Sequence, residues 1–172
     1  MPVVSGAEFL KAARKGGYAV GGYNTNNLEW TQAILEAAEA KKAPVLIQTS
    51  MGAAKYMGGY KVAKDMITNL VDSMNITVPV AIHLDHGDYE AALECIEVGY
   101  TSIMFDGSHL PFEENLKLAK DVVEKAHAKG ISVECEVGSI GGEEDGIIGT
   151  GELADIEECK QMVATGIDYL AC

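Results

Sequence analysis

The strongest constraint in this 172-residue sequence is a regular alternation of short apolar segments with amphipathic helical segments. Strand-like segments start near positions 18, 44, 78, 102, 131 and 167, and a helical pattern separates each from the next. Strands that are separated by helices in this way lie parallel in one sheet and are joined by right-handed crossovers. The sequence therefore predicts an α/β protein with a parallel sheet.

Two architectures contain such a sheet, an open doubly wound sheet and a TIM (β/α)8 barrel. We predict the barrel, because polar residues follow every strand-like segment instead of one glycine-rich turn after the first strand. A barrel needs eight strands and about 250 residues. We therefore expect residues 1–172 to be the N-terminal portion of a single barrel domain, with about its first six strands and without its C-terminal strands.

Charge and hydropathy narrow the range of partners. The chain has 26 acidic and 13 basic residues, a formal net charge of −13, and its basic residues are scattered. Such a surface offers no basic face to nucleic acid. No apolar run approaches the roughly 18 residues of a membrane helix, and the N-terminus lacks a basic segment followed by a hydrophobic one. We expect a cytoplasmic protein that binds neither nucleic acid nor membranes.

The densest group of ionisable side chains lies where the third apolar segment ends. Residues 78–87 read VPVAIHLDHG, so a buried strand emerges at His83, Asp85 and His86. Burying such groups unpaired costs several kcal/mol, which calls for a metal, a partner or a water-lined site. Strand alternation predicts His83 and Asp85 on one face and His86 on the other. The alternative is a strand end whose polar groups bond to loop backbone.

In a barrel, the residues that follow the strands share one rim, where the chemistry takes place. Histidines among carboxylates on that rim suit a divalent metal with general acid and base partners. The glycine-rich loop 138–151 contains three acids, which are either a solvated face or part of a hinged lid over bound substrate. The predicted rim contains Asn24, Ser50, His83, Asp85, His86, Asp106, Glu134, Glu136, Glu143, Glu144 and Asp145.

Two stretches resemble the signature motifs of the class II, metal-dependent fructose-1,6-bisphosphate aldolases and of the closely similar tagatose-bisphosphate aldolases. They are VAIHLDHG at 80–87 and VECEVGSIGGEE at 133–144, and the similarity extends to YNTNN at 23–27, QTSMGA at 48–53 and FDGSHLPFEEN at 105–115. The resemblance implies a glycolytic and gluconeogenic lyase that reversibly cleaves fructose 1,6-bisphosphate to dihydroxyacetone phosphate and glyceraldehyde 3-phosphate. A tagatose-1,6-bisphosphate aldolase and a non-catalytic barrel fragment with a binding role remain alternatives.

The resemblance also implies a metal centre. His86 matches a zinc ligand of the family, and Asp106 and Glu136 match positions linked to an alternative or second metal site. The implied cofactor is Zn²⁺, with a second divalent or a monovalent cation left open. Two further zinc histidines of the family have no counterpart in residues 1–172. No lysine lies at a predicted strand end, which favours the metal route over a Schiff base.

The remaining implied roles concern the substrate, a phosphorylated ketose. Asp85 matches the acid/base that acts on the C4 hydroxyl, and Glu144 matches a lid carboxylate that exchanges a proton with the enediolate carbon. Asn24 and Ser50 match substrate contacts, and His83 matches a residue that supports the metal ligands from behind. The family also implies a homodimer or homotetramer.

Overall fold

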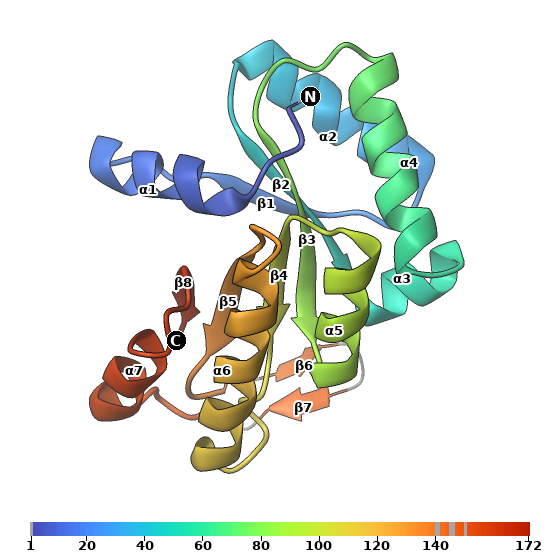
Figure 1. The fold of residues 1–172 in the computed structure, drawn as a ribbon. Coiled ribbons are helices and arrows are strands. Elements are labelled where there is room, and N and C mark those ends of the chain that lie inside the picture. The colour runs from blue at the N-terminus through green and yellow to red at the C-terminus, as the bar shows by residue number, and fades with distance from the viewer. Residues whose placement is uncertain (1, 140–141, 145–146, 150) are drawn as a thin grey trace.

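Six parallel strands form a half-barrel, as Figure 1 shows. The computed structural model describes residues 2–139, 142–144, 147–149 and 151–172, with side chains described outside residues 140–150. The order of the strands in the sheet follows their order in the chain, which confirms the predicted parallel α/β fold. Among the described strands there is no reversal of order of the kind that defines a doubly wound sheet. The strands are β1 Gly21–Asn24, β2 Val45–Ser50, β3 Val80–Gly87, β4 Ser102–Phe105, β5 Ser132–Glu136 and β8 Tyr169–Ala171.

The helices between the strands form an outer layer, and α5 and α6 run along one face of the sheet in Figure 1. Each helix of this layer contacts the next one along the chain. The outward residues Ile47, Ile82, Ile103 and Val133 are fully buried beneath it, as is typical of a parallel sheet. The layer contains α2 Leu28–Lys41, α4 Tyr60–Ser73, α5 Tyr89–Val98, α6 Phe112–His127 and α7 Ile156–Val163.

One helix lies apart from this layer. Helix α1, Gly6–Gly16, begins at Ser5, whose side chain accepts a hydrogen bond from the backbone N–H of Ala7. Its buried Phe9 packs against Leu46 and Ala81 near the start of β2 and β3. Helix α1 therefore covers the amino-terminal end of the half-barrel interior, and the carboxyl ends of the strands stay open for the polar side chains.

The sequence predicts a loop from Ser50 to Gly59 and a second loop over residues 138–151, and the structure has regular elements in both segments. Helix α3, Met51–Met57, follows β2 directly, because the Ser50 side chain caps it and Gly58, with φ of 101°, ends it. The segment after β5 contains an antiparallel hairpin of β6 Gly142–Glu144 and β7 Ile147–Gly149. Among the residues that the structure describes, no helix is both long enough and apolar enough to cross a bilayer.

Candidate active site

A β-bulge near the end of β3 places His86. Leu84 pairs with Ile103 and Gly87 pairs with Phe105, so β3 contains one residue more than β4 over this interval. His86 lies within this bulge and has φ of 48°, in the left-handed region that few non-glycine residues occupy. The prediction from strict alternation, which turns His86 to the face opposite Asp85, is therefore wrong. The bulge instead directs the imidazole toward side chains from β4 and β5.

His86 meets two carboxylates at the carboxyl ends of neighbouring strands. Its Nδ1 lies 2.8 Å from Oδ2 of Asp106, which follows β4, and 3.7 Å from Oε2 of Glu136 at the end of β5. One potential ligand atom from each of the three residues lies within 4.8 Å of the others. Ligands about 2 Å from one ion are at most about 4 Å apart, so small side-chain movements would let all three bind one cation.

The surroundings of Asp106 keep its carboxyl group ionised. Burial alone would raise its pKa, but hydrogen bonds from His86 and Ser108 outweigh that effect and lower the pKa to about 2. The backbone N–H of Ser108 donates to Oδ1 of Asp106 at 2.9 Å, which leaves Oδ2 directed at the imidazole. Glu136 is 3% exposed, and Asn115 fixes its backbone by donating to the carbonyl oxygen at 3.0 Å. Two carboxyl groups beside an imidazole are suited to a divalent cation.

Asp85 lies beside this cluster and is held by two amides. Asn24 at the end of β1 donates to its Oδ2 at 2.7 Å, and Gln48 of β2 donates to its Oδ1 at 3.3 Å. Ser50 is the pairing partner of Asp85 in β2, and its hydroxyl accepts the N–H of Ala53 as the cap of α3. The structure thus brings Asn24, Ser50 and Asp85 to one rim, and it adds Gln48, whose side chain the sequence does not single out.

His83 lies below the rim and is fully buried. Its Nδ1 is 2.8 Å from the Ser102 hydroxyl, and its Nε2 is 3.4 Å from Oε2 of Glu134. Burial, with a smaller effect of His86, lowers the pKa of His83 to about 3. Burial, followed by the charge of Asp85, raises the pKa of Glu134 to about 7. The imidazole of His83 is therefore neutral at neutral pH, and the neighbouring Glu134 carboxyl changes its protonation state near that pH.

The last predicted site residue, Glu144, has its backbone in β6, and its side chain lies outside the described part of the chain. The ends of its loop are held together, because the Ser139 N–H donates to the Glu152 carbonyl at 3.0 Å and the Glu152 N–H donates to the Ser139 hydroxyl at 3.1 Å. In Figure 1 the hairpin lies at the end of the sheet where the arrowhead of β3 points. The predicted role of Glu144 as a lid carboxylate stays a prediction.

A parallel α/β half-barrel with histidine and carboxylates at the carboxyl ends of its strands has the layout of an α/β-barrel enzyme. Comparison with known proteins narrows this class. The family model "Fructose-bisphosphate aldolase class-II" matches residues 4–172. The chain therefore belongs to the class II fructose-bisphosphate aldolase family, as its motifs predict.

Individual relatives agree with this assignment. A fructose-bisphosphate aldolase from Streptococcus pneumoniae is 82% identical over 171 residues, which are 99% of this chain and 58% of that protein. One from Geobacillus stearothermophilus is 55% identical over 174 residues, 99% of this chain and 61% of that protein. The crystal structure of an aldolase from Escherichia coli K12 matches with a TM-score of 0.84 and 29% identity, over 98% of this chain and 61% of that one. The chain thus spans about three fifths of the length of these relatives.

Proposed function

We propose that this chain provides the catalytic rim of a class II aldolase that reversibly cleaves fructose 1,6-bisphosphate to dihydroxyacetone phosphate and glyceraldehyde 3-phosphate. The observation that carries the proposal is the meeting of His86, Asp106 and Glu136 beside Asp85. The proposal includes the eight-stranded barrel, of which residues 1–172 form the N-terminal portion of a single domain. A homodimer or homotetramer also remains part of the proposal.

The three clustered residues would hold the metal, which we propose to be Zn²⁺. Imidazole nitrogen and carboxylate oxygen are both zinc ligands, and catalytic zinc sites use about three protein ligands. The 2.8 Å hydrogen bond between His86 and Asp106 supports this, because a cation replaces the shared proton of such a pair. When bound, the cation supplies positive charge that stabilises the oxygen charge left when the carbon–carbon bond breaks.

Asp85 would be the general base in cleavage. Both its oxygens accept hydrogen bonds from amides, which orient the carboxylate without neutralising it. From the carboxyl end of β3 it would take the proton of the C4 hydroxyl and return it in the reverse condensation. The Asn24 amide would donate one hydrogen bond to Asp85 and contact the substrate with its remaining polar atoms. The Ser50 hydroxyl accepts a hydrogen bond as the cap of α3, so its own proton could be donated to the substrate.

Two further assignments complete the proposal. His83, which is buried and hydrogen-bonded to Ser102, would hold β3 in the geometry that orients Asp85 and His86. Glu144 would exchange a proton with the enediolate carbon. No lysine lies on any of the described strands, so these strands provide no side-chain amine that could form a Schiff base with the substrate.

A chimera tests the proposed reaction. This chain would replace the matched segment of the Streptococcus pneumoniae relative, and cleavage of fructose 1,6-bisphosphate would be followed with the zinc content of the same sample. We expect turnover with about one zinc per subunit, and we expect Asp85→Asn to lower kcat at least about 100-fold while zinc stays bound. Asp72→Asn, at an exposed position of α4, is the matched control and should leave kcat unchanged.

Three results would count against the proposal. Full turnover by Asp85→Asn would remove the assigned role of Asp85. A folded chimera without zinc or cleavage would favour the non-catalytic alternative. A higher kcat/KM on tagatose 1,6-bisphosphate than on fructose 1,6-bisphosphate would change the assigned substrate and leave the reaction class intact.

A further inference from the structure

The side chain of Asn115, in the first turn of α6, contacts two segments that carry carboxylates of the candidate metal centre. Asn115 is 2% exposed. Its amide nitrogen donates to the backbone carbonyl oxygen of Glu136 at 3.0 Å. Its amide oxygen faces Gly107, where an added Cβ would lie 2.5 Å from that oxygen. One buried amide therefore lies between the residue that follows Asp106 and the backbone of Glu136.

The hydrogen bond to Glu136 lies just beyond the last paired residue of β4. Ser132 at the start of β5 donates its N–H to the Thr101 carbonyl at 3.3 Å, so its backbone groups face β4. Residues two and four positions along a strand face the same neighbour, so the Glu136 carbonyl also points toward β4. Strand β4 ends at Phe105, one residue short of the level of Glu136. The Asn115 amide therefore supplies a donor at a position that β4 does not reach.

The Asp106 segment is fixed on the other side of the same amide. The Asp106 N–H donates to the Gly87 carbonyl of β3 at 2.9 Å, and the Ser108 N–H donates to Oδ1 of Asp106 at 2.9 Å. An added Cβ at Gly107 would be closer to the Asn115 oxygen than to the Phe105 ring, which would be 2.9 Å away. The Asn115 side chain therefore limits how closely this segment can approach the end of β5.

We propose that Asn115 is a positioning residue for the metal centre, which sets the separation of the Asp106 and Glu136 carboxylates and thereby raises the affinity for the cation. The inference rests on the proposed function, because it takes both carboxylates as metal ligands. Ligands that are held in place before the metal arrives bind it more tightly, since less ordering is needed on binding. Residues that fix metal ligands by hydrogen bonds typically change metal affinity 10- to 100-fold.

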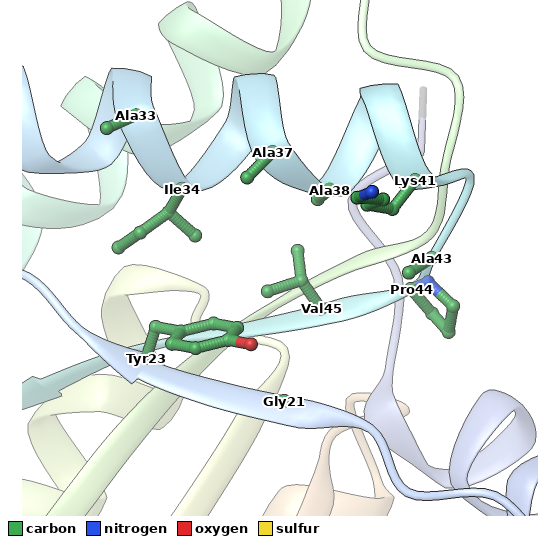
Figure 2. Close-up of a pocket in the computed structure, with 10 residues that line it drawn as sticks. All are labelled: Gly21, Tyr23, Ala33, Ile34, Ala37, Ala38, Lys41, Ala43, Pro44 and Val45. Atoms are coloured by element: carbon green, nitrogen blue, oxygen red, sulfur yellow. The ribbon is translucent and has the colours of Figure 1, made fainter.

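A role in packing alone explains this position less well. Helices of this fold meet the sheet through apolar side chains, and Figure 2 shows Ile34 and Ala37 of α2 facing Val45 of β2. Among the buried residues of α6, all of which the structure describes, Asn115 alone is polar. Its Oδ1 accepts no hydrogen bond from the described part of the chain, a cost that an apolar side chain would avoid.

Zinc affinity tests the proposal without relying on catalysis. The variants would be made in the chimera with the Streptococcus pneumoniae relative, and zinc affinity would be measured by competition with a chelator. Asn115→Leu replaces the amide with an apolar group of similar size, and Asn115→Ala is the second variant in case leucine prevents folding. Leu116→Ala is the matched control, because Leu116 is the next residue of α6, is 9% exposed and packs in the hydrophobic core. Urea unfolding of the metal-free proteins would measure their stability.

We expect the Asn115 variants to bind zinc about 10- to 100-fold more weakly than the unmodified chimera. The visible absorption of bound Co²⁺, which depends on the arrangement of its ligands, should change as well. Leu116→Ala should unfold at a lower urea concentration and leave the zinc affinity and the Co²⁺ spectrum unchanged.

Two results would overturn this inference alone. One is an Asn115→Leu variant that binds zinc as tightly as an unmodified chimera that does bind it. The other is an equal loss of zinc affinity in Leu116→Ala, because weaker packing of α6 would then explain both losses. An unmodified chimera that binds no zinc would contradict the proposed metal centre and this inference together.

Discussion

Replacing His83 with glutamine should change how stability depends on pH. The buried imidazole has a pKa of about 3 in the folded chain, compared with an ordinary value of 6.5, and burial is the main cause. Below pH 6.5 the unfolded chain therefore binds a proton at this position that the folded chain does not bind. The free energy of unfolding falls as the pH decreases from 6.5 toward 3, and His83→Gln removes this contribution.

The size of the effect follows from the shift. One pKa unit corresponds to about 1.4 kcal/mol. His83 should therefore lower the free energy of unfolding of the wild-type chain by about 2 kcal/mol when the pH falls from 8 to 5. Glutamine retains an amide near Ser102 but fills the site less well, so the variant should be less stable at pH 8. The stability difference between wild type and His83→Gln should then shrink by about 2 kcal/mol at pH 5.

Urea unfolding of the 172-residue chain at a series of pH values measures this difference. Ser102→Ala is the matched control, because it removes the hydrogen bond to Nδ1 and leaves the imidazole buried. That control should lower the free energy of unfolding by a similar amount at every pH. A difference between wild type and His83→Gln that does not change from pH 8 to pH 5 would refute the argument that a neutral, buried imidazole lies beneath the rim.

Three further predictions concern other parts of the fold. Phe9→Ala should lower the free energy of unfolding by about 3 kcal/mol in urea titrations, because the ring is 8% exposed where α1 covers the half-barrel; a loss below about 1 kcal/mol would contradict that packing. Gly138→Ala should speed proteolysis between residues 139 and 152 relative to wild type, because Gly138 has φ of 85° and an added Cβ would lie 2.7 Å from a backbone oxygen. Hydrogen bonds from Lys42 and Thr77 lower the pKa of Glu39 to about 2. The free energy of unfolding of wild type should therefore exceed that of Glu39→Gln by its full amount above pH 4.5, and this difference should vanish toward pH 2.

The order of the strands and the convergence of site residues could be predicted from the sequence. Parallel strands place their carboxyl ends at one rim, so residues that follow separate strands must meet there. Asp85 near the end of β3, Asp106 just after β4 and Glu136 at the end of β5 lie at that rim. The alternation of strands and helices alone predicts this convergence, because the convergence depends on the topology of the sheet and not on the contacts of individual side chains.

The details that the sequence did not predict depend on contacts between distant segments. The bulge that turns His86 toward Glu136 arises from the pairing of β3 with β4, and the local sequence pattern does not predict it. Gln48 reaches Asp85, and Glu134 reaches His83, only because of the register between strands. Helix α3 was missed for a different reason, since the glycines around it resemble a loop until the capping of Ser50 is seen.

The most direct test of the central claim is anomalous X-ray diffraction at the zinc edge from crystals of the chain grown with zinc. The account predicts a peak about 2 Å from ligand atoms of His86, Asp106 and Glu136, and predicts that crystals of Glu136→Gln, grown in the same way, show a weaker peak or none. A zinc peak elsewhere on the chain, or no peak at saturating zinc, would contradict the assignment of these three residues as a metal centre.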